Sequence, residues 1–228
     1  MLILALESSA KSVSCAVCDG TELLGQYFQN SKLTHSRTLL SMAESLLQNL
    51  DVALSEIELI AVSNGPGSFT GVRIGVAAAK GLAWGLGIPV CGVSPLQAMA
   101  YQTPEPGHLL CCVMDARRGE VYNALFKWED SMPVRLCDDR AISLDALAAE
   151  LRGIHSPCLL LGDGAAVSYE ALSAAGVRCL MAPELHRWQT AYGVALAAVN
   201  GEHISSAQLA PVYLRPSQAE RVRNESER

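Results

Sequence analysis

The sequence predicts an α/β protein of two lobes, each with the element order β-β-β-α-β-α. Apolar runs of strand length alternate with longer stretches in which apolar residues recur at helical spacing. This order of elements occurs on both sides of residues 103–107 (Thr-Pro-Glu-Pro-Gly), a linker by composition. Hydrophobic residues make up 50% of the 228-residue chain, which is enough for a core in each lobe. A repeated unit of this kind indicates two lobes related by duplication.

The first half of the chain contains a strand meander followed by alternating helices and strands. Apolar runs predict strands at residues 2–6, 12–18, 23–29, 59–62 and 89–93, with a hairpin turn at Asp19-Gly20. Helical spacing predicts helices at 34–50, with Thr34 as the N-cap, at 72–86, ending at Gly87, and from about Pro95.

The second half of the chain repeats this order. Strands are expected at residues 109–114, 120–127, 134–137 and 158–161, and helices at 144–151 and 192–199. We therefore expect an N-terminal lobe at 1–103, a C-terminal lobe at 104–216 and a mobile tail at 217–228.

Net charge and cysteine usage restrict the class of protein. The formal net charge of -6 repels a polyanion on average, so the chain is a poor candidate for holding nucleic acid by itself. Between residues 215 and 228, four Arg are offset by three Glu. The eight cysteines are spread along the chain, mostly in apolar runs, and are interpreted as reduced core thiols of a cytosolic protein. The cysteines in such runs are Cys15, Cys91, Cys111, Cys112 and Cys158.

No targeting or membrane segment is expected. The apolar start at residues 1–6 has no basic region before it and no cleavage site, so it is interpreted as a strand. No apolar stretch reaches about 18 residues without a charge. The predicted location is the cytoplasm.

A glycine-rich turn at residues 64–71 is the strongest local motif. A strand that enters such a turn and leaves as a helix brings backbone N–H groups and a positive helix end together, which can hold a phosphate. Gly65, Gly67 and Ser68 are therefore weak phosphate-site candidates, although a tight turn for close packing is the favoured interpretation. The turn lacks the Gly-Lys-Ser/Thr ending of a P-loop, and Pro66 precludes a nucleophile elbow at Ser68.

The helix after this turn has almost no polar side. Of residues 72–84, only Arg73 and Lys80 are charged. A surface helix of a monomer usually carries a polar face, so this helix is expected to bury one side on its own sheet and to offer the other to a second chain. Complete enclosure of the helix within its own chain stays open as the alternative.

The remaining motifs indicate no catalytic, metal or cofactor site. Cys15-x-x-Cys18 lies on a strand, where residues three apart point to opposite faces, and no second ligand pair accompanies it. The five histidines are scattered without metal-ligand spacing. The charged segment 115–122 is interpreted as a solvated hairpin tip or part of an interface.

Four segments together resemble the bacterial TsaB family, also called YeaZ, of the tRNA threonylcarbamoyladenosine pathway. They are residues 4–9 (Leu-Ala-Leu-Glu-Ser-Ser), the glycine motif at 65–75, the hairpin at 115–122, and 211–215 (Pro-Val-Tyr-Leu-Arg). Glu7 departs from the family pattern, in which many members carry Asp. The resemblance covers nearly the whole chain and implies an actin-like or Hsp70-like ATPase fold of two lobes.

The resemblance also implies partners. They are TsaD, the catalytic paralogue that transfers the threonylcarbamoyl group to adenosine 37 of tRNA, and the ATPase TsaE. A homodimer is expected when the chain is alone, and contact with tRNA only through the complex. The family contacts use the two N-lobe helices, so the expected interface residues are His35, Leu39, Ala43, Leu46, Phe69, Arg73, Val76, Ala77 and Lys80.

The same resemblance separates this chain from its catalytic paralogue. TsaD-like proteins carry a metal-binding His-x-x-x-His where this chain has Val-Ser-Pro-Leu-Gln-Ala-Met at residues 93–99. A non-catalytic subunit of the tRNA-modifying complex is therefore expected. The rival hypotheses are an autonomous kinase-like, nucleotide-binding enzyme, for which Glu7 alone supplies too few carboxylates for Mg²⁺, and a peptidase, for which no nucleophile–base pair is visible.

Overall fold

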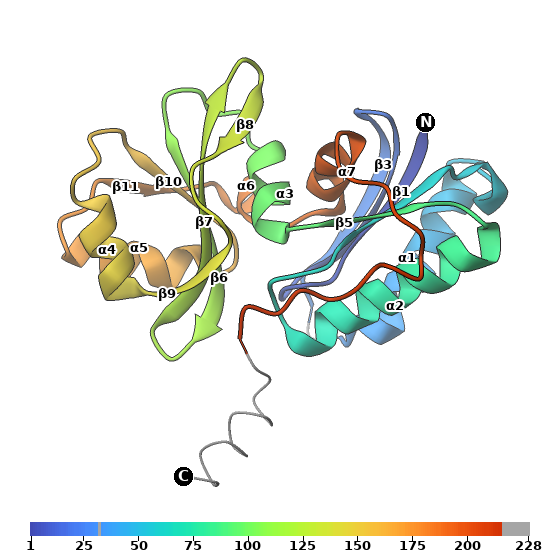
Figure 1. Cartoon of the computed structure of the whole chain (residues 1–228), viewed down its shortest axis with the longest axis horizontal. Helices are drawn as coiled ribbons and strands as arrows, with labels where there is room; N and C mark the ends of the chain where they lie inside the picture. Colours follow the sequence, from blue (N-terminus) through green and yellow to red (C-terminus); the bar gives the residue numbers. More distant parts are fainter. Residues whose placement is uncertain (32, 216–228) are drawn as a thin grey trace, which may run out of the picture.

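The chain folds into two α/β lobes that lie side by side (Figure 1). This computed structural model describes residues 1–31 and 33–215, so the tail expected at 217–228 lies outside the described residues. Each lobe has its own sheet, and helix α3 (Pro95–Tyr101) lies between them. The prediction of two lobes with a repeated element order is confirmed.

The N-terminal sheet has five strands in the order β3-β2-β1-β4-β5. Strands β1, β2 and β3 form an antiparallel meander, whereas β4 pairs parallel to β1 and β5 parallel to β4. The bounds are β1 Leu2–Glu7, β2 Val13–Asp19, β3 Glu22–Gln29, β4 Leu59–Ser63 and β5 Val90–Val93, with a short 3-10 helix at Leu54–Glu56.

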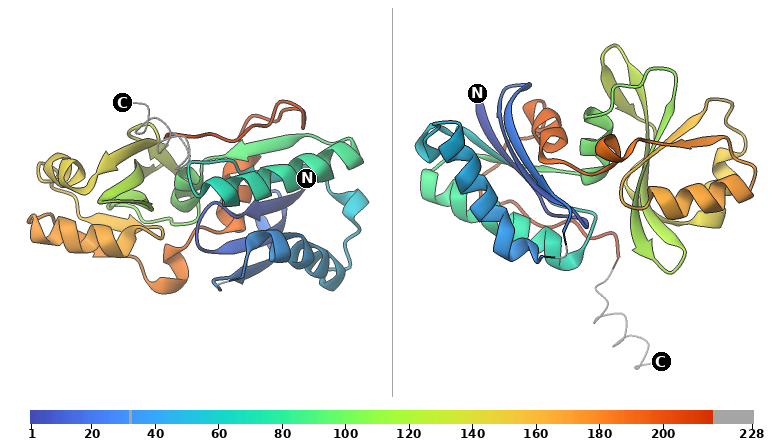
Figure 2. Two further views of the ribbon diagram at one scale, coloured as in Figure 1. Left: turned by 90° about the horizontal axis from the view of Figure 1, so that it is seen from below. Right: turned by 180° about the vertical axis from the view of Figure 1, so that it is seen from behind.

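Helices cover both faces of the N-terminal sheet. Helices α1 (His35–Asn49) and α2 (Phe69–Leu86) pack on one face, and α7 (Ala191–Val199) packs on the other beside α3 (Figure 2). Alternate residues of β1 therefore enter different cores: Leu4 lies under α1 and α2, and Ala5 lies under α7. Because both faces are buried, the strand is continuously apolar instead of alternating.

The cysteine pair on β2 follows the same alternation. Cys15 points to the core under α1 and α2, whereas Cys18 points to the core under α7. Burial raises the pKa of each thiol to about 12. The prediction that these two thiols face opposite sides of the sheet is confirmed.

The C-terminal sheet repeats the arrangement of the first. Its order is β11-β10-β6-β7-β8, with β9 pairing with β7, so β6 takes the central position that β1 has in the other lobe. The strands are β6 Leu109–Arg117, β7 Glu120–Glu129, β8 Met132–Arg135, β9 Arg140–Ser143, β10 Cys158–Leu161 and β11 Cys179–Met181. Its helices are α4 Leu144–Leu151, α5 Ala165–Ala174 and α6 Glu184–Arg187.

Two sequence-based expectations need correction. The helix expected at residues 192–199 is present as α7, but it packs on the N-terminal sheet, and the last helix of the C-terminal repeat is α5. Helix α5 is not predicted by the sequence, because its own small and apolar residues occur on all of its sides and give no clear helical period. The expected boundary between residues 103 and 104 separates the strands of the two sheets. The expected division of the whole chain into an N-terminal lobe at 1–103 and a C-terminal lobe at 104–216 stays a prediction.

Helix α2 begins one turn earlier than expected. Its N-cap is Ser68, whose side-chain oxygen accepts a hydrogen bond from the Gly71 N–H, and its C-cap is Gly87 with a φ of 70°. The Thr34 N-cap of α1 is present in position, but its hydroxyl makes no capping hydrogen bond. Across the described parts of the chain, no helix has the length and apolar character needed to cross a membrane.

The contact between α3 and α7 depends on a glycine, and this yields a stability prediction. A Cβ at Gly193 would lie 2.4 Å from the Ala98 carbonyl oxygen, which belongs to the backbone of α3. We expect Gly193→Ala to lower the free energy of unfolding by about 1–3 kcal/mol, because the two helices must move apart. Urea titration followed by circular dichroism measures the change.

The matched control is Gly85→Ala on α2, where an added Cβ would meet no atom within 4 Å. This substitution should be neutral or stabilising by about 0.5 kcal/mol, because alanine favours helix. Equal destabilisation by both substitutions would contradict the packing explanation.

Candidate functional site

The glycine turn joins β4 to α2 and brings three backbone segments together. A Cβ at Gly67 would lie 2.4 Å from the Ser9 carbonyl oxygen, and one at Gly71 would lie 2.1 Å from that of Ser8. Gly65 has a φ of 117°, and its Cβ would lie 2.2 Å from the Val212 carbonyl oxygen. The glycines thus admit the turn after β1 on one side and a C-terminal segment on the other.

Polar groups of the turn are used within the chain. The Ser68 N–H donates to the Ser9 carbonyl oxygen at 2.7 Å, and the Ser8 hydroxyl donates to the Gly71 carbonyl oxygen at 2.9 Å. These contacts agree with the tight-packing interpretation of the motif. A phosphate role for Gly65, Gly67 and Ser68 stays a prediction.

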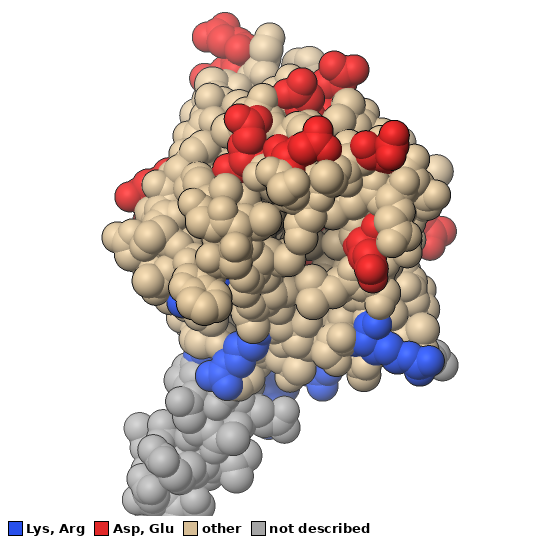
Figure 3. Space-filling view, turned by 90° about the vertical axis from the view of Figure 1, so that its right-hand side faces the viewer, with Lys and Arg blue, Asp and Glu red and all other residues tan. Residues whose placement is uncertain are grey.

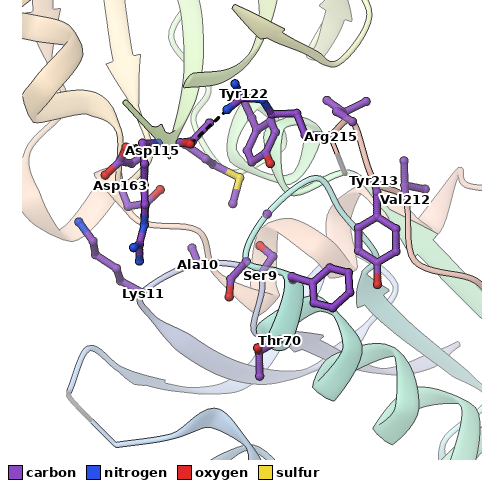
Figure 4. A pocket seen from close by; sticks show the side chains of 17 residues that line it. Ser9, Ala10, Lys11, Thr70, Asp115, Tyr122, Asp163, Val212, Tyr213 and Arg215 are labelled. Carbon is purple, nitrogen blue, oxygen red and sulfur yellow. Dashed lines mark hydrogen bonds between the residues drawn. The ribbon is translucent and has the colours of Figure 1, made fainter. Parts of the chain in front are cut away.

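A cavity of about 440 Å³ lies between the lobes, next to the first turn of α2 (Figure 4). Its walls come from the β1–β2 turn, the glycine turn with the start of α2, the β6–β7 hairpin, the β10–α5 turn and residues 212–215. Two carboxylates (Asp115 and Asp163) and three cations (Lys11, Arg117 and Arg215) line it. The size suits a small molecule, and the mixture of charges selects neither sign of ligand.

The cavity lining lacks the pairing that acid–base or nucleophilic catalysis needs. Burial raises the pKa of Asp163, whose carboxylate accepts a hydrogen bond from the Gln189 side chain at 3.2 Å. The hydroxyls of Ser9, Ser68 and Thr70 line the cavity, but no histidine does. Within residues 1–31 and 33–215, no group of three or more His, Cys, Asp or Glu could hold a metal ion.

Glu7 ends β1 as a fully buried carboxyl group. One of its oxygens accepts hydrogen bonds of 2.6 Å from both the N–H and the hydroxyl of Ser9, and the other accepts one from the Ser63 hydroxyl. Burial raises its pKa, and the hydrogen bonds oppose this only partly. Glu7 therefore anchors the turn next to α2 and is absent from the cavity lining.

Several residues expected at the partner interface lie inside the chain's own core. Leu39, Ala43, Leu46 and Val76 are only 1–4% exposed, because they fill the layer between the helices α1 and α2 and the sheet. For these four residues the expectation was wrong. The apolar side of α2 had been expected to face a partner, but Val76 and its neighbours lie on the side that covers β1 and β4.

The other five expected interface residues lie at or near the surface. His35 contacts the Ala10 carbonyl oxygen through Nε2 at 2.8 Å, and Ala77 is exposed. Phe69 and Arg73 contact the Tyr213 ring in the C-terminal segment, and the Lys80 ammonium group donates a 2.8 Å hydrogen bond to the Leu209 carbonyl oxygen. Their interface role stays a prediction.

The outer side of α2 carries a residue that sequence reasoning missed. Trp84 is 82% exposed and follows Arg73, Ala77 and Gly81 along the solvent side of the helix. Trp84 lies two helical turns after Ala77, and this spacing could have predicted that both residues lie on the same side of the helix. At the N-lobe end of the molecule, Asp and Glu gather toward one edge and Lys and Arg along the opposite edge, with uncharged surface between (Figure 3).

Comparison with known proteins identifies relatives along the whole chain. Residues 22–164 match the family model described as "TsaD: tRNA N6-adenosine threonylcarbamoyltransferase". The tRNA threonylcarbamoyladenosine biosynthesis protein TsaB of Bacillus subtilis is 30% identical over 221 residues, 96% of each chain. TsaB of Escherichia coli is 36% identical over 134 residues, 58% of this chain and 57% of its own.

Solved structures agree with this result. YeaZ from Pseudomonas aeruginosa superposes with a TM-score of 0.76 at 26% identity, over 93% of this chain and 99% of its own. A Pseudomonas aeruginosa protein described as uncharacterized, with similarity to peptidase YeaZ, gives 0.80 at 26% identity, over 94% and 99%.

The paired sheets with a cavity between them define a two-lobed protein of the actin-like ATPase fold. Within that class, the chain belongs to the TsaB (YeaZ) family of tRNA threonylcarbamoyladenosine biosynthesis proteins. The resemblance noted in the sequence is thereby confirmed.

The buried carboxyl group of Glu7 yields a prediction of pH dependence. Because its pKa is raised in the folded state, ionisation disfavours folding, and stability is lost as pH rises from about 4.5, the ordinary value for Glu. Glu7→Gln keeps a side-chain oxygen for Ser9 and removes this ionisation. We expect the stability of Glu7→Gln, minus that of the unmodified chain, to increase between pH 4.5 and pH 7.

Urea unfolding at several pH values measures this difference, and all other titrating groups cancel in the comparison. A difference that stayed constant across the range would contradict a raised pKa for Glu7.

Proposed function

We propose that this chain is a cytoplasmic, non-catalytic subunit of the machinery that forms N6-threonylcarbamoyladenosine at position 37 of tRNA. In this role it binds a TsaD-type catalytic subunit through the solvent side of α2. The observation that carries the proposal is the outer face of this helix, where small residues lead to a tryptophan that is 82% exposed.

An exposed tryptophan on a helix of small residues is a favourable docking surface. Tryptophan is enriched among residues that dominate binding energy, because a large apolar ring is removed from water when a partner covers it. Small side chains such as Ala77 and Gly81 let a second helix approach closely. Large apolar groups left exposed in a monomer are a mark of interaction sites.

Similarity to a known family indicates the kind of partner that this chain binds. Similarity to the TsaD family model over residues 22–164 supports pairing with an actin-like paralogue. In the absence of TsaD, a second copy can use the same face as a homodimer.

The absence of catalysis is proposed from residue types. The segment at 93–99 has no histidine, and the cavity lining has no nucleophile–base pair. The Glu7 carboxyl group is buried and accepts hydrogen bonds from serine side chains. These features also argue against the kinase-like and peptidase hypotheses. With a net charge of -6, the chain meets tRNA only within the complex, to which TsaE is added as the third protein.

The partner face yields a mutational prediction. Trp84→Glu places a charge on the outer side of α2 without touching the core, so the chain should fold normally and lose TsaD binding at least tenfold, by roughly 1.4 kcal/mol or more. Native mass spectrometry and calorimetric titration with purified TsaD measure the complex, and a reconstituted tRNA modification assay measures its activity.

The matched control is Leu185→Glu, which introduces the same charge at an apolar residue that is 88% exposed on α6. This variant should bind TsaD as the unmodified chain does. Undiminished binding by Trp84→Glu would exclude the α2 face, and modification of tRNA without TsaD would exclude a non-catalytic role.

A further inference from the structure

After α7, the chain runs back along α2 as a C-terminal strap, defined here as residues 204–215 (Figure 1). Its first part is anchored in the N-terminal lobe. Ile204 and Val90 exchange two backbone hydrogen bonds of 2.9 Å, and Leu209 is buried in the core beneath α2. The Lys80 ammonium group donates to the Ala207 and Leu209 carbonyl oxygens.

The middle of the strap is seated on the glycine turn. The Val212 N–H donates to the Asn64 carbonyl oxygen at 2.7 Å, and the Asn64 side chain donates to the Ala210 carbonyl oxygen at 3.2 Å. Gly65 has no side chain, which leaves room for the Val212 carbonyl oxygen. The strap is thus held against the start of α2 by backbone contacts.

The distal part of the strap forms a ring stack with the first turns of α2. The rings of Tyr213 and Phe69 lie 5.0 Å apart, and the Arg73 guanidinium group lies 3.7 Å above the Phe69 ring. The Arg73 Nε–H also donates to the Tyr213 hydroxyl at 2.8 Å. Cation–π and tilted ring contacts of this kind fix the direction in which the chain leaves α2.

The next residues of the strap cross to the other lobe. One guanidinium nitrogen of Arg215 donates to the Ala116 carbonyl oxygen at 3.3 Å, and another forms an ion pair with Glu120. Both acceptors lie at the tip of the β6–β7 hairpin. The Arg215 side chain therefore links the N-lobe strap to the C-terminal sheet.

This link lies on the cavity side of the molecule. Further lobe contacts are made by α3 and by Ala10 of the β1–β2 turn, which packs in the same core. There Leu96 and Met99 share a core with Leu110 and Phe126 of the C-terminal sheet. The strap residues 212–215 line the interlobe cavity, together with the hairpin residues 114–117. The α3 contact has the position of a hinge, and the strap spans the side that would open.

We propose that the distal strap is a latch that holds the two lobes closed over the interlobe cavity, with the Arg215–Glu120 pair as its releasable end. The strap base is buried through Leu209, so it stays in place when the end detaches. The ion pair has side chains that are 20% and 31% exposed, so salt weakens it. Tyr213 and Arg73 return the released end to its seat on α2.

Single-molecule energy transfer between the lobes tests this proposal. Dyes are attached through non-natural amino acids at Glu44 on α1 and Glu170 on α5, which are exposed and lie on different lobes. The full chain is measured with Arg215→Ala, with Glu120→Ala, and with the charge-swapped pair Glu120→Arg and Arg215→Glu. Arg152→Ala is the matched control, because Arg152 contacts only its own lobe through the Ala175 carbonyl oxygen.

We expect both alanine variants to increase the population with a longer interlobe distance several-fold. The unmodified chain should show the same trend when salt rises to about 0.5 M, because ions screen the pair. The charge-swapped chain should recover the closed population at low salt, and Arg152→Ala should match the unmodified chain. A double-alanine variant should open no further than Arg215→Ala alone, because Arg215→Ala already removes the ion pair.

Hydrogen exchange measured by mass spectrometry on the same variants separates a latch from a loose end. A latch predicts faster exchange in the strap residues 212–215 and in the hairpin residues 115–120 together with a changed interlobe distance. Faster exchange in the strap with an unchanged distance distribution in both alanine variants would overturn the proposal, and so would failure of the charge swap to restore closure.

Discussion

The structure depends on the close approach of the first turn of α2 to the end of β1. Gly67 and Gly71 allow the backbone carbonyls of Ser9 and Ser8 to lie where a side chain would otherwise stand. Buried Glu7 completes this junction, because its carboxyl group accepts hydrogen bonds from the polar groups of Ser9 and Ser63. The junction fixes α2 on the sheet and thereby decides which side of the helix faces solvent.

Most of the fold could be predicted because local patterns and tertiary packing agree. Strand β1 is continuously apolar because helices cover both of its faces. Ser68 and Gly87 are residue types that favour the N-cap and C-cap positions they occupy at the ends of α2. Helix α5 could not be predicted, because its small apolar residues give no period. The position of α7 could not be predicted either, because periodicity identifies a helix but not the sheet that it will cover.

The candidate site was less predictable than the fold. The sequence correctly indicates that α2 has almost no polar side, but burial of Val76 and exposure of Trp84 depend on how the helix is rotated on the sheet. That rotation results from contacts between residues more than sixty positions apart, such as Ser8 and Gly71. The cavity likewise joins five segments that are distant in the sequence, and no single motif predicts it.

The return of α7 to the first sheet has a consequence for synthesis on the ribosome. Ile3 and Ala5 on β1 are covered by a helix that begins at Ala191, so one face of the first sheet stays bare while the whole C-terminal lobe is translated and folded. The C-terminal lobe is inserted in the sequence between β5 and α7 of the N-terminal lobe, and it can fold before the N-terminal lobe is complete. The earlier lobe closes only when α7 emerges, which reverses the usual N-to-C order of domain folding.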